Sequence, residues 1–249
     1  MPTISDNSIV HVVAPSRLHM GFLDLGGSVG RRFGGIGLSL EQPATCFSIK
    51  RANTNRISGR KEEVQRIKLT IDKLRDLLKL ENHYAINVKD TIPAHSGLGS
   101  GTQLAIALGM GVARLEGYDI STTELARLLG RGARSAIGIS AFDGGGFIVD
   151  GGRGPETVVP PILMQTKFPD DWRVLLVLDR HSKGVHGARE QHAFETLPAL
   201  PDRDFAHICH LVLMRLMPGL IERNIAAFGE AITEIQRIVG RQFAPAQAG

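Results

Sequence analysis

The sequence has little cysteine, few aromatic residues and no long apolar run. Only two of its 249 residues are cysteines, Cys46 and Cys209, and their positions match no metal or redox motif. Such sparse cysteine suits a reducing compartment. Aromatic residues make up 5% of the chain and no run of lysine and arginine occurs, so a nucleic-acid partner is disfavoured. Without a polar-free stretch of about 20 residues or a signal sequence at the start, we expect a cytoplasmic protein that does not span a membrane.

The composition is otherwise that of a globular protein with an excess of glycine. Apolar residues make up 43% and charged residues 22% of the chain, and there are 29 glycines. The glycines are clustered, which indicates tight turns and close approach of the backbone to a ligand. The net charge of +4 is compatible with anionic substrates.

The order of the predicted elements indicates a layered α/β or α+β protein. Runs rich in β-branched residues predict strands at residues 9–14, 46–51, 84–88 and 147–150, and a strand buried on both faces at 173–178. Apolar residues at helical spacing predict helices at residues 61–80, 102–115, 122–130, 205–219 and 222–239. In the third helix, Ser121 and Glu124 form the S-x-x-E pattern of a capping box. Gly109 and Gly111 weaken the second helix and therefore indicate close packing against a neighbour.

The strongest local signal is a Gly-rich loop from Pro93 to Gln103 that runs into a helix. A helix N-terminus presents unpaired N–H groups and the positive end of the helix dipole, and glycines let a bulky anion approach. The loop lacks the G-K-[ST] of a Walker motif and the spacing of a dinucleotide fingerprint. A glycine turn that merely caps a helix is the structural alternative. The predicted phosphate-binding residues are Ser96, Gly97, Leu98, Gly99, Ser100, Gly101, Thr102 and Gln103.

Several blocks of the chain resemble one known family in the same order. They are residues 14–25, 33–39, 93–103, 130–138 and 145–152, and the resemblance spans most of residues 9–190. The Pro-x-x-x-Gly-Leu-Gly-Ser-Gly loop is similar to the phosphate motif of the GHMP kinase superfamily. The closer match is to its branch of β-ribofuranosylaminobenzene 5′-phosphate synthases.

The resemblance implies a fold, a reaction and a cofactor. The fold would be two-layer α+β or α/β, with a ribosomal-S5-like domain over residues 1–165 and a ferredoxin-like domain over 166–249. The second domain would be incomplete, since the superfamily's third Gly-rich motif is not found. The reaction would join phosphoribosyl pyrophosphate to 4-aminobenzoate or 4-hydroxybenzoate, with loss of pyrophosphate and CO2, in tetrahydromethanopterin biosynthesis. Mg²⁺ would be the cofactor and a homodimer the assembly. No lysine stands in a reactive setting, so pyridoxal phosphate is not expected.

Residues beside the glycine-rich segments are the candidates for this chemistry. A departing pyrophosphate needs cations and N–H groups around it, and arginine grips phosphate bidentately. The predicted catalytic residues are Arg17, His19 and Asp24; further phosphate ligands are Arg31, Arg131 and Arg134; the metal ligands are Ser100, Thr102 and Asp143; and a possible second cluster holds Lys183, His186 and Glu190. Each has a structural alternative. His19 can be a core histidine, Asp24, Asp143 and Asp150 can form turns beside glycines, and the second cluster can be a solvated helix start.

Two other functions stay open. A kinase of the superfamily is disfavoured because its catalytic aspartate would fall near Gly138, and no aspartate occurs between Glu124 and Asp143. Gly101 also replaces the second serine common in the kinase loop. A non-catalytic protein that binds a phosphorylated ligand is the third possibility, because the third motif is missing.

Overall fold

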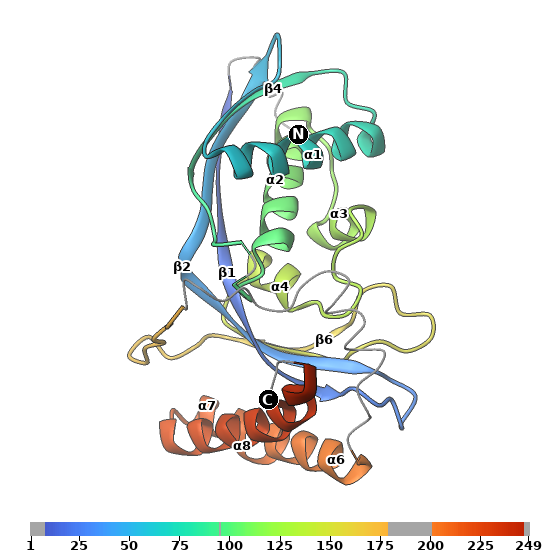
Figure 1. The fold of residues 1–249 in the computed structure, drawn as a ribbon, viewed down its shortest axis with the longest axis vertical. Helices are drawn as coiled ribbons and strands as arrows, with labels where there is room; N and C mark the ends of the chain where they lie inside the picture. The colour runs from blue at the N-terminus through green and yellow to red at the C-terminus, as the bar shows by residue number, and fades with distance from the viewer. Residues whose placement is uncertain (1–7, 95, 179–200, 247–249) are drawn as a thin grey trace.

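The sheet is mixed and is built around one long antiparallel hairpin (Figure 1). The computed structural model describes residues 8–94, 96–178 and 201–246, and in them a six-stranded sheet. Strands β1 (Ile9–Asp24) and β2 (Phe33–Ala52) pair along nearly their whole length. The other edge of β2 pairs with β5 (Phe147–Asp150) near its start and with β4 (His83–Asp90) near its end. A gap is therefore left beside the middle of β2.

The remaining elements cover the two faces of this sheet. The short strands β3 (Arg56–Ser58) and β6 (Ile162–Thr166) lie outside β4 and β5. One helical layer consists of α1 (Lys61–Leu78), α2 (Ser100–Glu116), α3 (Thr122–Leu128) and α4 (Ile137–Asp143). The second consists of α6 (Asp202–Leu211), the π-helical turn η1 (Val212–Leu216), α7 (Met217–Ile221), α8 (Ile225–Phe243) and the short η2 (Ala244–Ala246). Figure 1 shows these two groups against different parts of the curved sheet.

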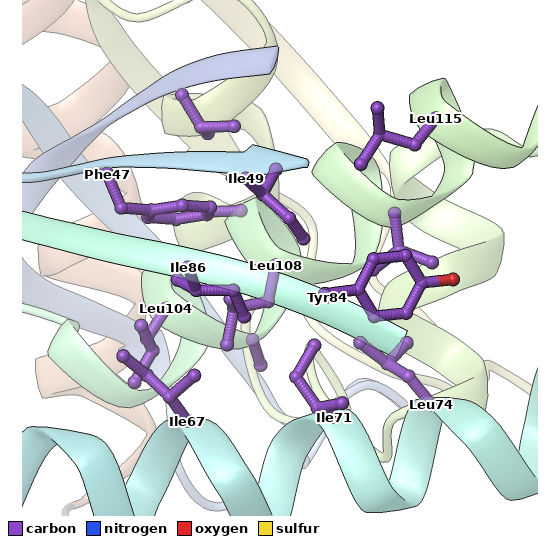
Figure 2. Packing of buried hydrophobic residues seen from close by; sticks show 14 of the residues in the cluster. Phe47, Ile49, Ile67, Ile71, Leu74, Tyr84, Ile86, Leu104, Leu108 and Leu115 are labelled. Atoms are coloured by element: carbon purple, nitrogen blue, oxygen red, sulfur yellow. The ribbon is translucent and has the colours of Figure 1, made fainter. Parts of the chain in front are cut away.

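The core beneath α1 and α2 follows the predicted helical periodicity (Figure 2). Ile67, Ile71 and Leu74 lie three or four residues apart on α1 and are buried against Tyr84 and Ile86 of β4. Burial of each such side chain stabilises the fold by about 1.5–3 kcal/mol. The spacing that predicted this helix is thus the spacing that attaches it to the sheet.

Glycines inside α2 let it approach its neighbours. A Cβ on Gly109 would lie 2.4 Å from Leu125 of α3, and one on Gly111 would lie 3.2 Å from Ile49 and 3.3 Å from Val12. This confirms the close packing that the two glycines predict. It also fixes the position of the α2 N-terminus, because the middle of the helix cannot shift without a clash.

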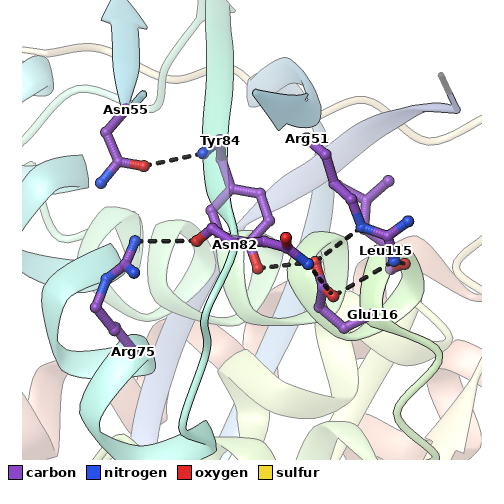
Figure 3. Close-up of polar contacts among 7 residues, drawn as sticks. All are labelled: Arg51, Asn55, Arg75, Asn82, Tyr84, Leu115 and Glu116. Carbon is purple, nitrogen blue, oxygen red and sulfur yellow. Dashed lines mark hydrogen bonds and ion pairs between the residues drawn. The ribbon is translucent and has the colours of Figure 1, made fainter. Parts of the chain in front are cut away.

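A polar network secures the opposite end of α2 (Figure 3). The Glu116 carboxylate accepts hydrogen bonds from Arg51 at 3.2 Å, from Asn82 at 2.9 Å and from the Tyr84 hydroxyl at 2.9 Å. Burial alone would raise the pKa of Glu116, but these donors outweigh it and hold the pKa below its usual range. Arg51 also donates to the carbonyl of Leu115 and so caps the helix. The network joins α2 to β2 and β4.

The predicted strand at residues 173–178 is wrong. The described part of that segment has no regular secondary structure, and Leu175 and Val177 are each 86% exposed. The physical reason is that no described strand pairs with it, since β6 is the last strand of the observed sheet. Lys183, His186 and Glu190 lie outside the described residues. The domain boundary between residues 165 and 166 stays a prediction.

Among the described residues, one helical stretch, Asp202–Ile221, is long and apolar enough to be considered for a membrane span, with a mean hydropathy of 1.3. Its side chains Phe205, Ile208 and Leu216 are buried in the core that also holds Ile36 of β2. A helix with such a buried stripe has the pattern of a core helix.

Candidate functional site

The Gly-rich loop leads into α2 with its helix start uncapped. Gly97 and Gly99 take positive φ angles of 76° and 77°, and no side chain caps the helix at Gly99. The carbonyl of Gly99 accepts from the amides of Thr102 and Gln103. Within the described part of the chain, the amides of Ser100 and Gly101 have no hydrogen-bond acceptor. These amides and the helix dipole make an anion site.

Arg17 on β1 contacts this loop with both its backbone and its side chain. Its amide donates to the carbonyl of Leu98 at 3.1 Å, and its Nη1 donates to the carbonyl of Gly97 at 2.6 Å. A Cβ on Gly99 would lie 3.1 Å from Cγ of Arg17. The predicted Arg17 is therefore brought to the predicted phosphate loop, with its cation beside the uncapped helix start.

His19 lies two residues further along β1, and its Nε2 is buried without a hydrogen-bond partner among the described residues. Its ring centroid lies 4.4 Å from that of Phe22 with the two planes tilted by 42°, and a Cβ on Gly35 would lie 3.0 Å from Nε2. Burial, then the positive charges of Arg17 and Arg134, lower the pKa of His19 to about 3. The imidazole is therefore neutral near pH 7, which suits it to hydrogen bonding rather than to carrying a proton.

The start of α4 is locked against the start of α2. Gln103 is fully buried, and its Nε2 donates to the carbonyl of Gly138 at 2.7 Å. A Cβ on Gly138 would lie 3.2 Å from the Thr102 methyl carbon. The position where the superfamily's kinases place an aspartate thus holds a glycine in close contact with the loop helix. Oε1 of Gln103 is buried with no donor in the described structure.

Asp150 positions the segment that carries two predicted arginines. Its Oδ2 accepts from the Ser135 hydroxyl at 2.7 Å and from the amide of Ala136 at 3.1 Å, and its Oδ1 accepts from the amide of Gly152 at 3.0 Å. Burial raises the pKa of this carboxyl even though those donors oppose the shift. Asp150 is therefore engaged by the fold, in agreement with the structural alternative for it. Its fully buried side chain could not be foreseen from the adjacent glycines.

The arginines of the 131–134 segment lie near the loop and His19. Nη1 of Arg131 is 3.8 Å from the Cβ position of Gly101 at the start of α2. The positive charge of Arg134 contributes, after burial and Arg17, to lowering the pKa of His19. Arg17 and Arg131 therefore place two predicted cations beside the helix start, whereas Arg134 contributes its charge at His19.

Other predicted site residues lie elsewhere or are engaged in the fold. Arg31 donates from Nε and Nη2 to the carbonyls of Gly151 and Gly152, both at 2.8 Å, so it braces the segment after β5. Asp24 accepts from the amides of Gly26 and Gly27 at 2.7 and 2.8 Å, as its turn-forming alternative expects. It therefore does not orient His19. The Ser96 hydroxyl donates to the carbonyl of Pro93 at 2.8 Å.

The predicted metal ligands are not brought together. Asp143 ends α4 and accepts from the Thr122 hydroxyl at the start of α3, whereas Gly138, near the other end of α4, contacts Thr102. No group of three or more acidic, histidine or cysteine side chains suited to a metal occurs in residues 8–94, 96–178 and 201–246. Only the Ser100 and Thr102 hydroxyls remain at the loop, and Mg²⁺ held by few protein groups is usually completed by substrate phosphates.

A cavity of about 1,100 Å³ lies beside the middle of β2, where neither β4 nor β5 pairs with it. Its walls include Ser39, Gly145, Gln165, Phe168 and Trp172, and none of the predicted site residues. Ser39 is the register partner of Arg17, so the cavity begins one strand away from the loop site. Its walls come from segments far apart in the sequence, and no local pattern announces it.

Comparisons with known proteins show the family to which this chain belongs. The family model for the GHMP kinase N-terminal domain matches residues 65–148. A β-ribofuranosylphenol 5′-phosphate synthase of Methanothermobacter thermautotrophicus is 35% identical over 242 residues, which cover 89% of this chain and 74% of that protein. The protein of the same name from Archaeoglobus fulgidus is 35% identical over 236 residues, covering 90% and 74%. The chain belongs to this synthase family. It is thus an enzyme of the pentosyltransferase type within the GHMP kinase superfamily.

Solved structures confirm the fold expected for this family. The phosphomevalonate kinase of Streptococcus pneumoniae, in complex with phosphomevalonate and AMPPNP, has a TM-score of 0.63 at 10% identity and covers 94% of this chain and 80% of its own. The homoserine kinase of Cytophaga hutchinsonii has a TM-score of 0.58 at 15% identity, covering 93% and 73%. At such low identity the likeness shows the fold alone.

Proposed function

We propose that the protein joins phosphoribosyl pyrophosphate to 4-hydroxybenzoate and releases pyrophosphate and CO2. The observation that carries the proposal is the uncapped start of α2, clasped by Arg17 and next to the neutral ring of His19. The name of the relatives supports a phenol as the product. That favours the hydroxy acid over 4-aminobenzoate, the other acceptor that the sequence left open. The pathway proposed for the product is tetrahydromethanopterin biosynthesis.

The reaction balances without an added oxidant or base. The bond from ribose C1 to the pyrophosphate oxygen breaks, and its electron pair leaves with pyrophosphate. The ring carbon that bears the carboxylate forms a bond to C1 with a π electron pair. The bond to the carboxylate then breaks, its electrons restore the aromatic ring, and CO2 departs. The main task for the protein is therefore to neutralise the leaving group and to hold the two substrates in line.

The residues of the site suit these tasks. The amides at the start of α2 and the Arg17 guanidinium would bind the pyrophosphate as its charge grows. The ring hydroxyl becomes more acidic while the arene carries positive charge. A neutral His19 whose Nε2 has no partner in the described chain would accept a hydrogen bond from that hydroxyl. This is the role that we propose for the buried histidine.

Mg²⁺ fits the site as a companion of the pyrophosphate. The Ser100 and Thr102 hydroxyls at the start of α2 would hold it, and Asp143, placed at the far end of α4, would not. When bound, the ion would supply further neutralisation of the leaving group. We expect turnover to stop when the ion is chelated and to return when it is restored.

The competing function is an ATP-dependent kinase, because the solved structures with a similar fold include kinases. Gly138 speaks against it, because no carboxylate stands beside the loop helix at the place of the kinase base. The cytoplasmic location, which the sparse cysteine favours, and the homodimer, which the family resemblance implies, also stay proposals.

Carboxyl-labelled 4-hydroxybenzoate tests the proposal directly. The protein is mixed with Mg²⁺, phosphoribosyl pyrophosphate and the labelled acid, and released CO2 is counted, with 4-aminobenzoate in a parallel reaction. Release of label that requires phosphoribosyl pyrophosphate supports the synthase. Consumption of ATP with a sugar or alcohol, and no release of label, would establish the kinase instead. Binding of phosphoribosyl pyrophosphate without either reaction would favour a binding protein.

A further inference from the structure

Phenylalanine side chains from three elements meet beside His19. Phe22 lies three residues after His19 on β1, and the centroids of the two rings are 4.4 Å apart. Phe33, the first residue of β2, and Phe243, the last residue of α8, lie 6.3 and 6.2 Å from Phe22, centroid to centroid. These separations are typical of interacting aromatic rings. The histidine whose Nε2 has no partner in the described chain therefore lies against a cluster of three phenylalanines.

This phenylalanine cluster is largely separate from the hydrophobic core. Phe22 and Phe33 are half-exposed, and neither is among the residues that build the apolar clusters in the described part of the chain. Phe243 only borders the core that holds Ile36, as does Phe168, another half-exposed ring. Ligand pockets are lined mainly by apolar and aromatic side chains, so rings that lie outside the core beside an unpartnered polar atom indicate a ligand contact.

The backbone at Phe33 is held in a costly conformation. Its φ angle of 70° lies in the left-handed region, which is unfavourable for a residue with a side chain. The neighbouring Arg32 is fixed by two backbone hydrogen bonds with Arg153, each of 2.9 Å, and its guanidinium stands 5.4 Å from the centre of the Phe33 ring. Strain that the surrounding structure maintains is typical of residues that contact a ligand. The ring is also preorganised, which lowers the entropic cost of binding.

A glycine keeps the strand beneath these rings clear of side chains. Phe22 is the register partner of Gly35, and directly paired residues point to the same face of a sheet. A Cβ on Gly35 would lie 3.0 Å from Nε2 of His19 and 3.0 Å from Cδ1 of Ile137. Arg17 and His19 occupy the same face of β1 two residues apart, or about 6.6 Å at the usual rise of a strand. That spacing is comparable to the length of a benzoate with a hydroxyl opposite its carboxylate.

We propose that Phe22 and Phe33 line the subsite that holds the aromatic ring of the acceptor, with the ring hydroxyl at His19 and the carboxylate-bearing carbon toward the start of α2. The inference rests on the proposed function, in which the acceptor is an aromatic acid. Aromatic rings gain edge-to-face contacts with phenylalanine that a saturated ring does not, so the cluster selects an arene. The arene becomes positively charged when it attacks ribose C1, and the electron-rich faces of the two rings stabilise that charge.

Phe22 and Phe33 were not among the site residues predicted from the sequence, although both lie within blocks that resemble the family. An isolated phenylalanine in a strand is indistinguishable from a core residue until its neighbours are known. Only the register of β1 with β2 and the end of α8 bring the three rings together.

Calorimetric titration in the presence of pyrophosphate tests the subsite without relying on turnover. The probes are 4-hydroxybenzoate and trans-4-hydroxycyclohexanecarboxylate, which keeps both polar groups and lacks the aromatic ring. The variants are Phe22→Leu and Phe33→Leu, and the matched control is Phe168→Leu, which alters a half-exposed ring of a different aromatic group. We expect each variant to weaken binding of 4-hydroxybenzoate about fivefold and to change binding of the saturated probe and of pyrophosphate less than about twofold. The control should change all three affinities less than about twofold.

Several outcomes would overturn the subsite. Unchanged affinity for 4-hydroxybenzoate in both variants would refute it, as would an equal loss in Phe168→Leu. An equal loss for the saturated probe or for pyrophosphate would show that the rings only maintain the fold. Failure of the unaltered protein to bind 4-hydroxybenzoate would also refute the proposal. If Phe22→Leu unfolds, Phe33→Leu decides.

The subsite and the synthase activity can fail separately. Binding of 4-hydroxybenzoate that depends on Phe22 and Phe33, without any release of CO2 when phosphoribosyl pyrophosphate is added, would support the subsite and refute the synthase. Release of CO2 with the same KM for 4-hydroxybenzoate in the unaltered protein and both variants would support the synthase and refute the subsite.

Discussion

The neutral state of His19 makes the stability of the protein depend on pH in a way that can be measured. Burial and the charges of Arg17 and Arg134 lower the folded-state pKa from 6.5 to about 3. In the unfolded chain this histidine binds a proton below about pH 6.5, and in the folded protein it does not. The unfolded state thus binds more protons, and stability falls as the pH decreases from 6.5 toward 3.

The magnitude follows from the shift. One pKa unit corresponds to about 1.36 kcal/mol, so between pH 7 and pH 5 His19 alone should lower the free energy of unfolding by about 2 kcal/mol. Urea unfolding of the unaltered protein and of His19→Gln at both pH values measures it. The variant should lose about 2 kcal/mol less than the unaltered protein over that interval. His11→Gln, at an exposed position of the same strand, controls for removal of a histidine.

The neutral state of His19 is refuted if His19→Gln and the unaltered protein lose the same free energy of unfolding between pH 7 and pH 5. It is also refuted if the NMR signals of the His19 ring report a charged imidazole at pH 6. Either result would mean that the ring is more hydrated or better paired than its buried Nε2 indicates. The proposed hydrogen bond from the substrate hydroxyl would then lose its acceptor.

Three further changes test the fold and the loop. Gly109→Ala should lower the free energy of unfolding in urea by about 1–2 kcal/mol, because overpacking against Leu125 outweighs the gain in helix propensity. Gly229→Ala on α8, where a Cβ meets nothing within 4 Å, should raise it. Changes of the same sign in the two variants would contradict this. Glu116→Gln should lower the free energy of unfolding above about pH 4.3 and leave it equal to that of the unaltered protein in acid. The reason is that a carboxyl with a lowered pKa loses its stabilising contribution as the pH falls through that pKa. A difference in stability that does not change with pH would count against this. Arg17→Gln should weaken pyrophosphate binding about tenfold in calorimetry at a similar melting temperature, and unchanged affinity with a lower melting temperature would make Arg17 structural.

Much of the fold could be predicted because local patterns and packing agree. The helix α1 carries its buried residues at the spacing seen in the sequence, and the α2 glycines mark close packing. The strand predicted at residues 173–178 is wrong because an apolar run says nothing about whether a partner strand is present. The helix α4 was not predicted, because Gly138 within it has a low helix propensity. In the structure the start of α4 packs against the start of α2.

Some residues of the candidate site could likewise be predicted from the sequence, and others could not. The loop was predicted from its glycine spacing, and Arg17 from its place beside a glycine-rich segment within a block that resembles the family. The structure shows that the two are in contact. Asp24 and Arg31 have the right chemistry but are used by nearby backbone groups, which composition cannot reveal.

In the proposed reaction, the start of α2 and Arg17 bind the departing pyrophosphate while CO2 is released from the second substrate. The most direct measurement is the ratio of the two products from phosphoribosyl pyrophosphate and carboxyl-labelled 4-hydroxybenzoate with Mg²⁺. We expect one pyrophosphate for each CO2, and loss of both products together in Arg17→Gln. Pyrophosphate formed without CO2, or neither product formed while ATP is consumed, would contradict it.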